Sequence, residues 1–135
     1  MTKVKCSYLG NLNCETIHLQ SGSLIRTDAP LDHYGNGESF SPTDLLATSL
    51  GTCLLTIMAI KAKSKGFDLD GIYLNIEKLM TQNSERKIKE LIIDIFIPDT
   101  TPIENINFLK KASEDCPVTR NLSQEIDIKI NWHHK

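Results

Sequence analysis

The chain has 135 residues, of which 40% are apolar and 24% are charged, a length and composition that predict one folded domain with a single core. The formal net charge is −2, and both signs are spread along the chain, so charge gives no reason to expect nucleic acid or a membrane as a partner. The first residues lack the apolar stretch of a secretory signal, and we therefore expect a cytoplasmic protein.

The first elements in chain order are expected to be β-strands. Residues 2–9 and 14–20 alternate well enough to form two strands, with residues 10–13 as the turn between them. A third short strand is predicted at residues 23–27. Residues 28–40 hold proline, asparagine and two glycines without periodicity, and are expected to form a loop.

A long helix is predicted to follow this loop. Ser41 has the character of an N-cap, Pro42 suits the first helical position, and Asp44 is the acid of a capping box. Gly66 is the expected stop signal. Residues 45–60 carry no charge, and these 16 residues are short for a membrane span, so we interpret the helix as a core helix that is buried on all sides.

The second half of the chain continues with a hairpin of strands at residues 71–80 and 87–97. An amphipathic helix is predicted at residues 103–113, a short helical turn from Pro117, and a last strand at residues 124–132. The order is three strands, a helix, two strands, a helix, a short helix and a strand. It predicts an α+β fold.

The four cysteines are Cys6, Cys14, Cys53 and Cys116. In a cytosolic chain they are unlike a structural disulfide framework, and no spacing typical of a zinc site is present. We therefore expect neither a metal nor a cofactor. Cys53 lies in the middle of the long helix, where a cysteine is usually a small apolar side chain. The small residues around it allow close approach by another element or leave room for a ligand.

Cys116 directly precedes Pro117, which is favoured at the first position of a helix. Cys116 would then lie at a helix N-cap, where the helix dipole favours a thiolate. Arg120, one turn further on, would add positive potential. The alternative interpretation is an ordinary helix start with an exposed cation nearby.

Two segments together resemble the OsmC/Ohr family. SPTDLLATSLGTC, which ends at Cys53, is similar to the family's helix start, where a proline precedes the peroxidatic cysteine by eleven positions. DCPVTRNL, which contains Cys116, is similar to the family's second cysteine followed by proline. The glycine-containing loop at residues 35–37 and the order of elements also match, so the resemblance covers nearly the whole chain.

The resemblance implies antiparallel sheets packed around a long central helix in an intertwined homodimer. It also implies a thiol peroxidase that acts on organic hydroperoxides in defence against oxidative stress. Cys53 would be the peroxidatic cysteine and Cys116 the resolving cysteine, with a dithiol as the reductant that restores both thiols.

The sequence departs from the organic hydroperoxide resistance branch at two helper positions. That branch has a glutamate directly after the helix-start proline, where this chain has Thr43, and an arginine in the first hairpin, where this chain has none. We therefore expect the general OsmC-like branch. Glu38 in the glycine loop is the candidate for the missing acid. Arg26 before the long loop and Arg120 beside Cys116 are the candidates for the missing cation.

Two other functions remain open from the sequence. The first is a non-catalytic protein of the same fold that binds a small apolar or thiol-bearing ligand. The second is a purely structural subunit. A depressed pKa of the Cys53 thiol with a cation nearby would favour the enzyme over both alternatives.

Overall fold

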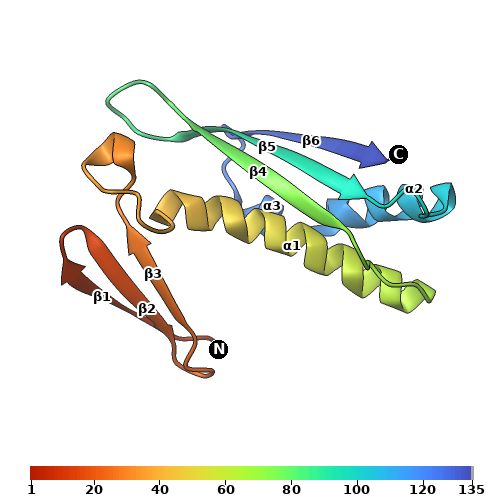
Figure 1. Ribbon diagram of the computed structural model, residues 1–135, viewed down its shortest axis with the longest axis horizontal. Helices are drawn as coiled ribbons and strands as arrows, with labels where there is room; N and C mark the ends of the chain where they lie inside the picture. The colour runs from red at the N-terminus through yellow and green to blue at the C-terminus, as the bar shows by residue number, and fades with distance from the viewer. Residues whose placement is uncertain (135) are drawn as a thin grey trace. The chain divides into compact units, whose positions relative to one another are not determined.

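The computed structural model describes residues 1–134. By their internal packing these residues form two compact units, residues 1–46 and residues 47–134. The first unit holds a three-stranded sheet and the glycine-containing loop. The second holds another three-stranded sheet, most of the long helix and the shorter helices (Figure 1). The α+β class predicted from the order of elements is confirmed.

The sheet of the first unit is antiparallel, in the order β1-β2-β3. Its strands are β1 (Val4–Gly10), β2 (Asn13–His18) and β3 (Leu24–Asp28), close to the three predicted ranges. Asn11 and Leu12 form the tight turn between β1 and β2, with φ of 53° and 62°. Two successive positive φ values are typical of the hairpin turns whose twist matches that of the strands.

The loop after β3 contains a single 3-10 turn, η1 (Leu31–His33), and folds back on its own start. The backbone N–H groups of Gly35 and Gly37 donate to the carbonyl oxygens of Pro30 (3.0 Å) and Ala29 (3.3 Å). A Cβ atom at Gly35 would lie 1.6 Å from the carbonyl oxygen of Ala29. The close approach of two backbone segments therefore requires glycine at this position.

Helix α1 (Pro42–Lys65) begins and ends as predicted. Its start is a reciprocal capping box: the backbone N–H of Ser41 donates to Asp44 Oδ2 at 2.9 Å, and the backbone N–H of Asp44 donates to Ser41 Oγ at 3.1 Å. Gly66 follows the last helical residue with φ of 94°, a left-handed conformation that ends helices.

The sheet of the second unit has the order β4-β5-β6. Its strands are β4 (Tyr73–Met80), β5 (Ile88–Ile97) and β6 (Asp127–His134). The connection from β5 to β6 contains α2 (Ile103–Ala112), the 3-10 turn η2 (Ser113–Asp115) and α3 (Pro117–Asn121). The expected antiparallel pairing holds for β4 and β5, but β5 and β6 are parallel. A long crossover through helices returns the chain to the same end of the sheet, which makes the pairing parallel.

The core of the second unit lies between α1 and this sheet, and Figure 1 shows α1 running along one side of β4 and β5. A Cβ atom at Gly51 would lie 2.5 Å from Ile76 Cδ1 and 3.0 Å from Leu74 Cδ1. The small residue thus serves close approach of a strand at this point. In the single chain the buried residues of α1 lie on one face, and burial of its other face in a homodimer stays a prediction. The buried residues are Ala47, Leu50, Gly51, Leu54, Met58 and Ala62.

The apolar character of α1 extends beyond the face that the sheet covers. By length and composition alone α1 could cross a membrane, although the core helix of a soluble protein passes the same test. Ile60 on the uncovered face is 59% exposed in the single chain. One three-stranded sheet can cover only one side of a 24-residue helix, so apolar side chains remain on the other side.

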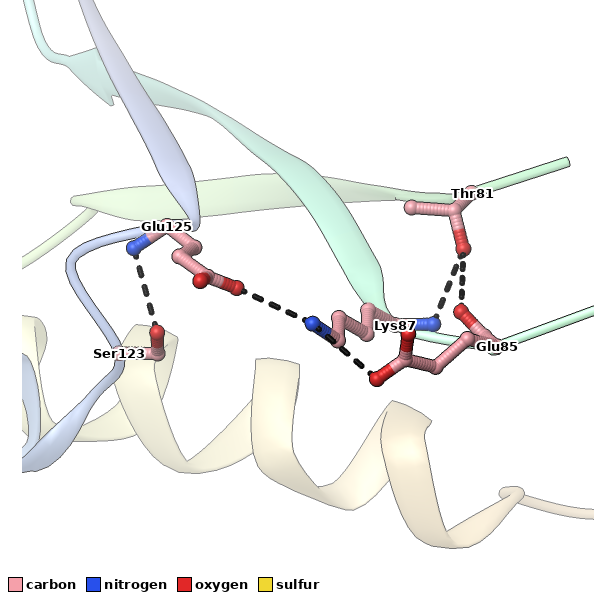
Figure 2. A network of polar contacts seen from close by, with 5 residues as sticks. All are labelled: Thr81, Glu85, Lys87, Ser123 and Glu125. Carbon is pink, nitrogen blue, oxygen red and sulfur yellow. Dashed lines mark hydrogen bonds and ion pairs between the residues drawn. The ribbon is translucent and has the colours of Figure 1, made fainter. Parts of the chain in front are cut away.

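A polar network ties the turn between β4 and β5 to the segment before β6 (Figure 2). Lys87 Nζ lies 3.4 Å from carboxylate oxygens of both Glu85 and Glu125. The hydroxyl of Thr81 accepts the backbone N–H of Lys87 at 3.0 Å and donates to the carbonyl of Glu85 at 3.1 Å. Ser123 Oγ accepts the backbone N–H of Glu125 at 3.2 Å. The network thus joins local contacts of the turn to the contact between Lys87 and Glu125, which are 38 residues apart in sequence.

Candidate functional site

Cys53 projects from α1 into a shallow apolar cavity of about 390 Å³. Its side chain is half-buried and packs against the core. The cavity is lined by three kinds of side chain: small polar residues of α1, isoleucines of α1 and the first residues of α3. They are Ser49, Thr52, Cys53, Thr56, Ile57, Ile60, Pro117 and Val118. The volume falls within the range of small-molecule sites.

Cys116 is the N-cap of α3, with Pro117 at the first helical position, as the sequence predicts. The residue is fully buried, with extended backbone at φ −73° and ψ 115°. Cys53 packs against the core cluster that contains Cys116, and each thiol shifts the pKa of the other, so the two cysteines are neighbours although they are 63 residues apart in sequence. The backbone N–H groups of Val118 and Thr119, which a helix start leaves without helical partners, are among the groups that lower the pKa of Cys116.

The pKa values of the two thiols are shifted in opposite directions. Burial raises the pKa of Cys53, and the hydrogen bond that its S–H donates to Cys116 raises it further. Burial also acts to raise the pKa of Cys116, but hydrogen bonds from Cys53, from the Thr119 side chain and from the backbone of Thr119 and Val118 outweigh it, so this pKa is lowered. In the resting pair Cys53 therefore holds the proton and Cys116 is the better thiolate.

The thiol pKa of Cys53 is expected to depend on Cys116. Because the pKa of Cys53 is raised, its alkylation by iodoacetamide should increase only at a pH above that of an ordinary exposed thiol. Replacing Cys116 by alanine removes the acceptor of the Cys53 S–H, so the alkylation profile of Cys53 should move to lower pH. Rates for Cys53, measured by mass spectrometry between pH 6 and 10, check this. An unchanged profile in Cys116→Ala would contradict the hydrogen-bonded pair.

The predicted cation beside Cys116 is engaged by a neighbouring carboxylate. Arg120 Nη2 lies 2.9 Å from Asp115 Oδ1, and Lys61 Nζ of α1 contacts Asp115 Oδ2. These two cations hold the pKa of Asp115 below its ordinary value, with the hydrogen bond from Lys61 as the largest cause. No cation is among the causes of either cysteine's pKa shift. The role of Arg120 in activating a thiol stays a prediction.

Glu38 lies in the loop of the first unit, exposed, and its backbone N–H donates to Asp28 Oδ2 at 3.0 Å. Its role as a helper acid stays a prediction. Asp28, which the sequence did not single out, is fully buried and also accepts Asn13 Nδ2 at 3.4 Å. Its own backbone N–H donates to the carbonyl of Phe40 at 3.0 Å. Asp28 thus anchors both ends of the loop that carries Glu38.

The other two cysteines lie on the first hairpin, which belongs to the first unit, whereas the pair described above belongs to the second. Cys6 is exposed, and its sulfur accepts the hydroxyl of Thr16 at 3.3 Å, whereas Cys14 is half-buried. Cys6 pairs with Thr16 in the β1–β2 register, and Cys14 pairs with Tyr8. Across residues 1–134, no three His, Cys, Asp or Glu side chains gather in a way that could hold a metal ion.

Comparison with known proteins identifies the family. The family described as OsmC-like protein matches residues 35–131. A crystal structure from Psychrobacter arcticus 273-4, named for osmotic stress and detoxification responses, is 39% identical, covers 98% of this chain and 96% of its own, and superposes with a TM-score of 0.90. An organic hydroperoxide resistance protein OsmC from Legionella pneumophila is 19% identical, with 98% and 96% coverage and a TM-score of 0.76.

The organic hydroperoxide resistance protein OhrB of Bacillus subtilis has the same fold, at 16% identity, with a TM-score of 0.72 over 98% of each chain. A comparison with curated sequences gave no match. The family match covers both cysteines and most of the chain, and the Psychrobacter structure agrees with it over nearly the full length. The chain therefore belongs to the OsmC-like family.

Proposed function

We propose that this protein is a thiol-dependent peroxidase that reduces organic hydroperoxides through Cys53 and Cys116. The observation that carries the proposal is Cys53 in the lining of an apolar cavity, with the buried Cys116 as its neighbour in the core. Two thiols in contact can deliver the two electrons that cleavage of an O–O bond requires. An apolar lining favours a peroxide with an organic substituent over hydrogen peroxide.

Access and acidity assign different roles to the two sulfurs. Cys53 lines the cavity, whereas Cys116 has no exposed surface, so a peroxide can reach Cys53 first. The pKa of Cys53 is raised and that of Cys116 is lowered, so in the resting pair the proton stays on Cys53 and a thiolate is better held at Cys116. By access, Cys53 is then the attacking sulfur and Cys116 the resolving thiol.

The reaction balances in two steps. The sulfur of Cys53 attacks the terminal peroxide oxygen, the O–O bond breaks, and the products are a Cys53 sulfenic acid and an alcohol. The sulfur of Cys116 then attacks the sulfenic acid, and a disulfide and one water form. A dithiol reductant restores both thiols by exchange and leaves as a disulfide. One hydroperoxide thus oxidises one dithiol, with alcohol and water as products.

Relatives support the hydroperoxide as substrate and oxidative stress as setting. The Legionella and Bacillus proteins are named for organic hydroperoxide resistance, and the Psychrobacter protein is named for a detoxification response. Cys53 lies on α1, which starts at the capping box, and Cys116 lies at the Cys–Pro start of α3. In the sequence these are the same segments that resemble the family's two cysteine motifs.

Turnover with a dithiol separates the enzyme from a binding protein. With excess dithiothreitol, purified protein should consume many equivalents of cumene hydroperoxide and release one cumyl alcohol per peroxide. The matched control is the double variant Cys6→Ser/Cys14→Ser, which should retain the rate because neither sulfur lies in the pair. Consumption no faster than dithiothreitol alone would overturn the proposal.

A specific observation also favours the second candidate, a non-catalytic protein that binds a small apolar or thiol-bearing ligand. The pKa of Cys53 is raised, so this sulfur is a thiol at neutral pH, and a thiol is a weak nucleophile. The cavity of about 390 Å³ has an almost wholly apolar lining that suits such a ligand. Failure of turnover together with saturable binding of an apolar ligand would make this function the better one.

The protein is further expected to act as a homodimer, with the 135 residues as one OsmC-like domain per subunit. Thr56, Ala59 and Ile60 on the uncovered face of α1 are exposed in the single chain, and a second copy would remove that apolar surface from water. Sedimentation velocity at micromolar concentration should give a dimer of about twice 15.2 kDa. A stable monomer would contradict this expectation.

A further inference from the structure

Asp115 lies between the chain segment that carries Cys116 and the helix that carries Cys53. Its two carboxylate oxygens have different partners: Oδ2 contacts Lys61 Nζ of α1, and Oδ1 contacts Arg120 Nη2 of α3 at 2.9 Å. Lys61 lies about two helical turns after Cys53 on α1. The segment 115–118 is therefore joined to α1 at two points, by charge at Asp115 and by the thiol contact at Cys116.

This ionic contact bridges 54 residues of sequence. The turn η2 and the five-residue α3 are too short to fix their own position, and the Cys116 thiol must be held within disulfide reach of Cys53. An isolated exposed ion pair contributes little, but a carboxylate that accepts two cations forms a small network with both oxygens engaged. The network crosses between the two elements that carry the sulfurs.

We propose that Asp115 is a positioning residue for the cysteine pair: through Lys61 it holds the start of α3 against α1, so that Cys116 stays within bonding distance of Cys53. This inference rests on the proposed function for its purpose, but the effect concerns only disulfide formation. Asp115 touches no substrate, and its expected effect is on the effective concentration of one thiol toward the other.

The test measures the equilibrium of the Cys53–Cys116 disulfide in glutathione buffers, in a Cys6→Ser/Cys14→Ser background. Asp115→Asn keeps the size of the side chain but removes its charge, and should lower the equilibrium constant for disulfide formation three- to tenfold, roughly 14–30 mV toward less negative potential. Asp115→Glu should retain most of the effect. The matched control is Glu114→Gln, an exposed neighbour with the same change in charge, which should leave the potential unchanged.

Lys61→Gln separates positioning from electrostatics. If Asp115 acted only by masking two cations, Asp115→Asn would stabilise the thiolates and Lys61→Gln would do the opposite. If Asp115 positions the turn, both variants shift the potential in the same direction, and the double variant adds little to either. Opposite shifts, or a potential in Asp115→Asn equal to that in Glu114→Gln, would overturn the proposal.

A purely structural role is distinguished by thermal unfolding. If Asp115→Asn only destabilises the fold, the Tm of the reduced form and the Tm of the oxidised form fall alike, and the redox potential of the Cys53–Cys116 disulfide does not change. That result would also overturn the positioning role of Asp115. The outcome is independent of peroxidase activity. A shifted potential in a protein that consumes no hydroperoxide would sustain the positioning role and remove the proposed function, and an unshifted potential in an active enzyme would do the reverse.

Discussion

Cys53→Ser is expected to reduce the consumption of cumene hydroperoxide with a dithiol to the rate without protein, a loss of at least about a hundredfold. The cavity that Cys53 lines leads to this sulfur, and Cys116 behind it has no exposed surface. A serine hydroxyl has nearly the same size but does not attack the O–O bond, so the fold should persist while the reaction stops. Circular dichroism of the variant checks that the fold is kept.

Cys116→Ser is expected to behave differently, because the accessible sulfur remains. One equivalent of hydroperoxide should convert Cys53 to a sulfenic acid, which dimedone traps, and excess peroxide should carry it to the sulfinic acid. Wild-type reactivity with peroxide in both variants would contradict the assignment of the pair.

Asp28→Ala is expected to lower the free energy of unfolding by about 2–4 kcal/mol, because it removes the acceptor of two donors in a buried site. The backbone N–H of Glu38 at 3.0 Å and Asn13 Nδ2 at 3.4 Å both lose their partner. Asp28→Asn should cost nearly as much, since an amide cannot accept on both atoms. Urea denaturation measures the change.

Glu38→Ala is the matched control for this loop. It removes an exposed carboxylate ten residues further along but keeps the backbone N–H that donates to Asp28, and should change the free energy of unfolding by less than about 0.5 kcal/mol. Equal effects of Asp28→Ala and Glu38→Ala would mean that the buried carboxylate does not anchor the loop. Faster proteolysis between residues 29 and 40 in Asp28→Ala alone would locate the loss at the loop.

Features that depend on a few neighbouring residues could be predicted from the sequence. The start of α1 follows from Ser41, Pro42 and Asp44, whose reciprocal hydrogen bonds are local. Cys116 at an N-cap follows from Pro117 alone. The contact between Cys116 and Cys53 was expected only from the family resemblance, because local patterns do not say which helix start meets which face of α1.

Features that depend on long-range packing could not be predicted. The parallel pairing of β6 with β5 depends on where the crossover ends, and alternation along a strand is the same in either direction. The burial of the Asp28 side chain has no signal in the sequence, since a carboxylate before a loop is usually solvated. The apolar run of α1 indicated burial but not that a single chain covers only one face of it.

The opposite pKa shifts of the two thiols also depend on packing. The sequence placed Cys116 at a helix start and Arg120 nearby, and both features favour a thiolate. In the structure the shift of Cys116 comes from hydrogen bonds, whereas Arg120 contacts Asp115. Lys61, which shares that carboxylate, is 54 residues away in sequence and could not be assigned to it beforehand.

The most direct measurement is a single turnover of the reduced protein with one equivalent of cumene hydroperoxide, followed by thiol counting and peptide mapping. The proposed mechanism predicts the loss of two of the four thiols, one cumyl alcohol per chain, and a single disulfide that joins the peptides of Cys53 and Cys116, with Cys6 and Cys14 still free. Four remaining thiols, or a disulfide that joins any other pair, would contradict the assignment of these two sulfurs as the reacting groups.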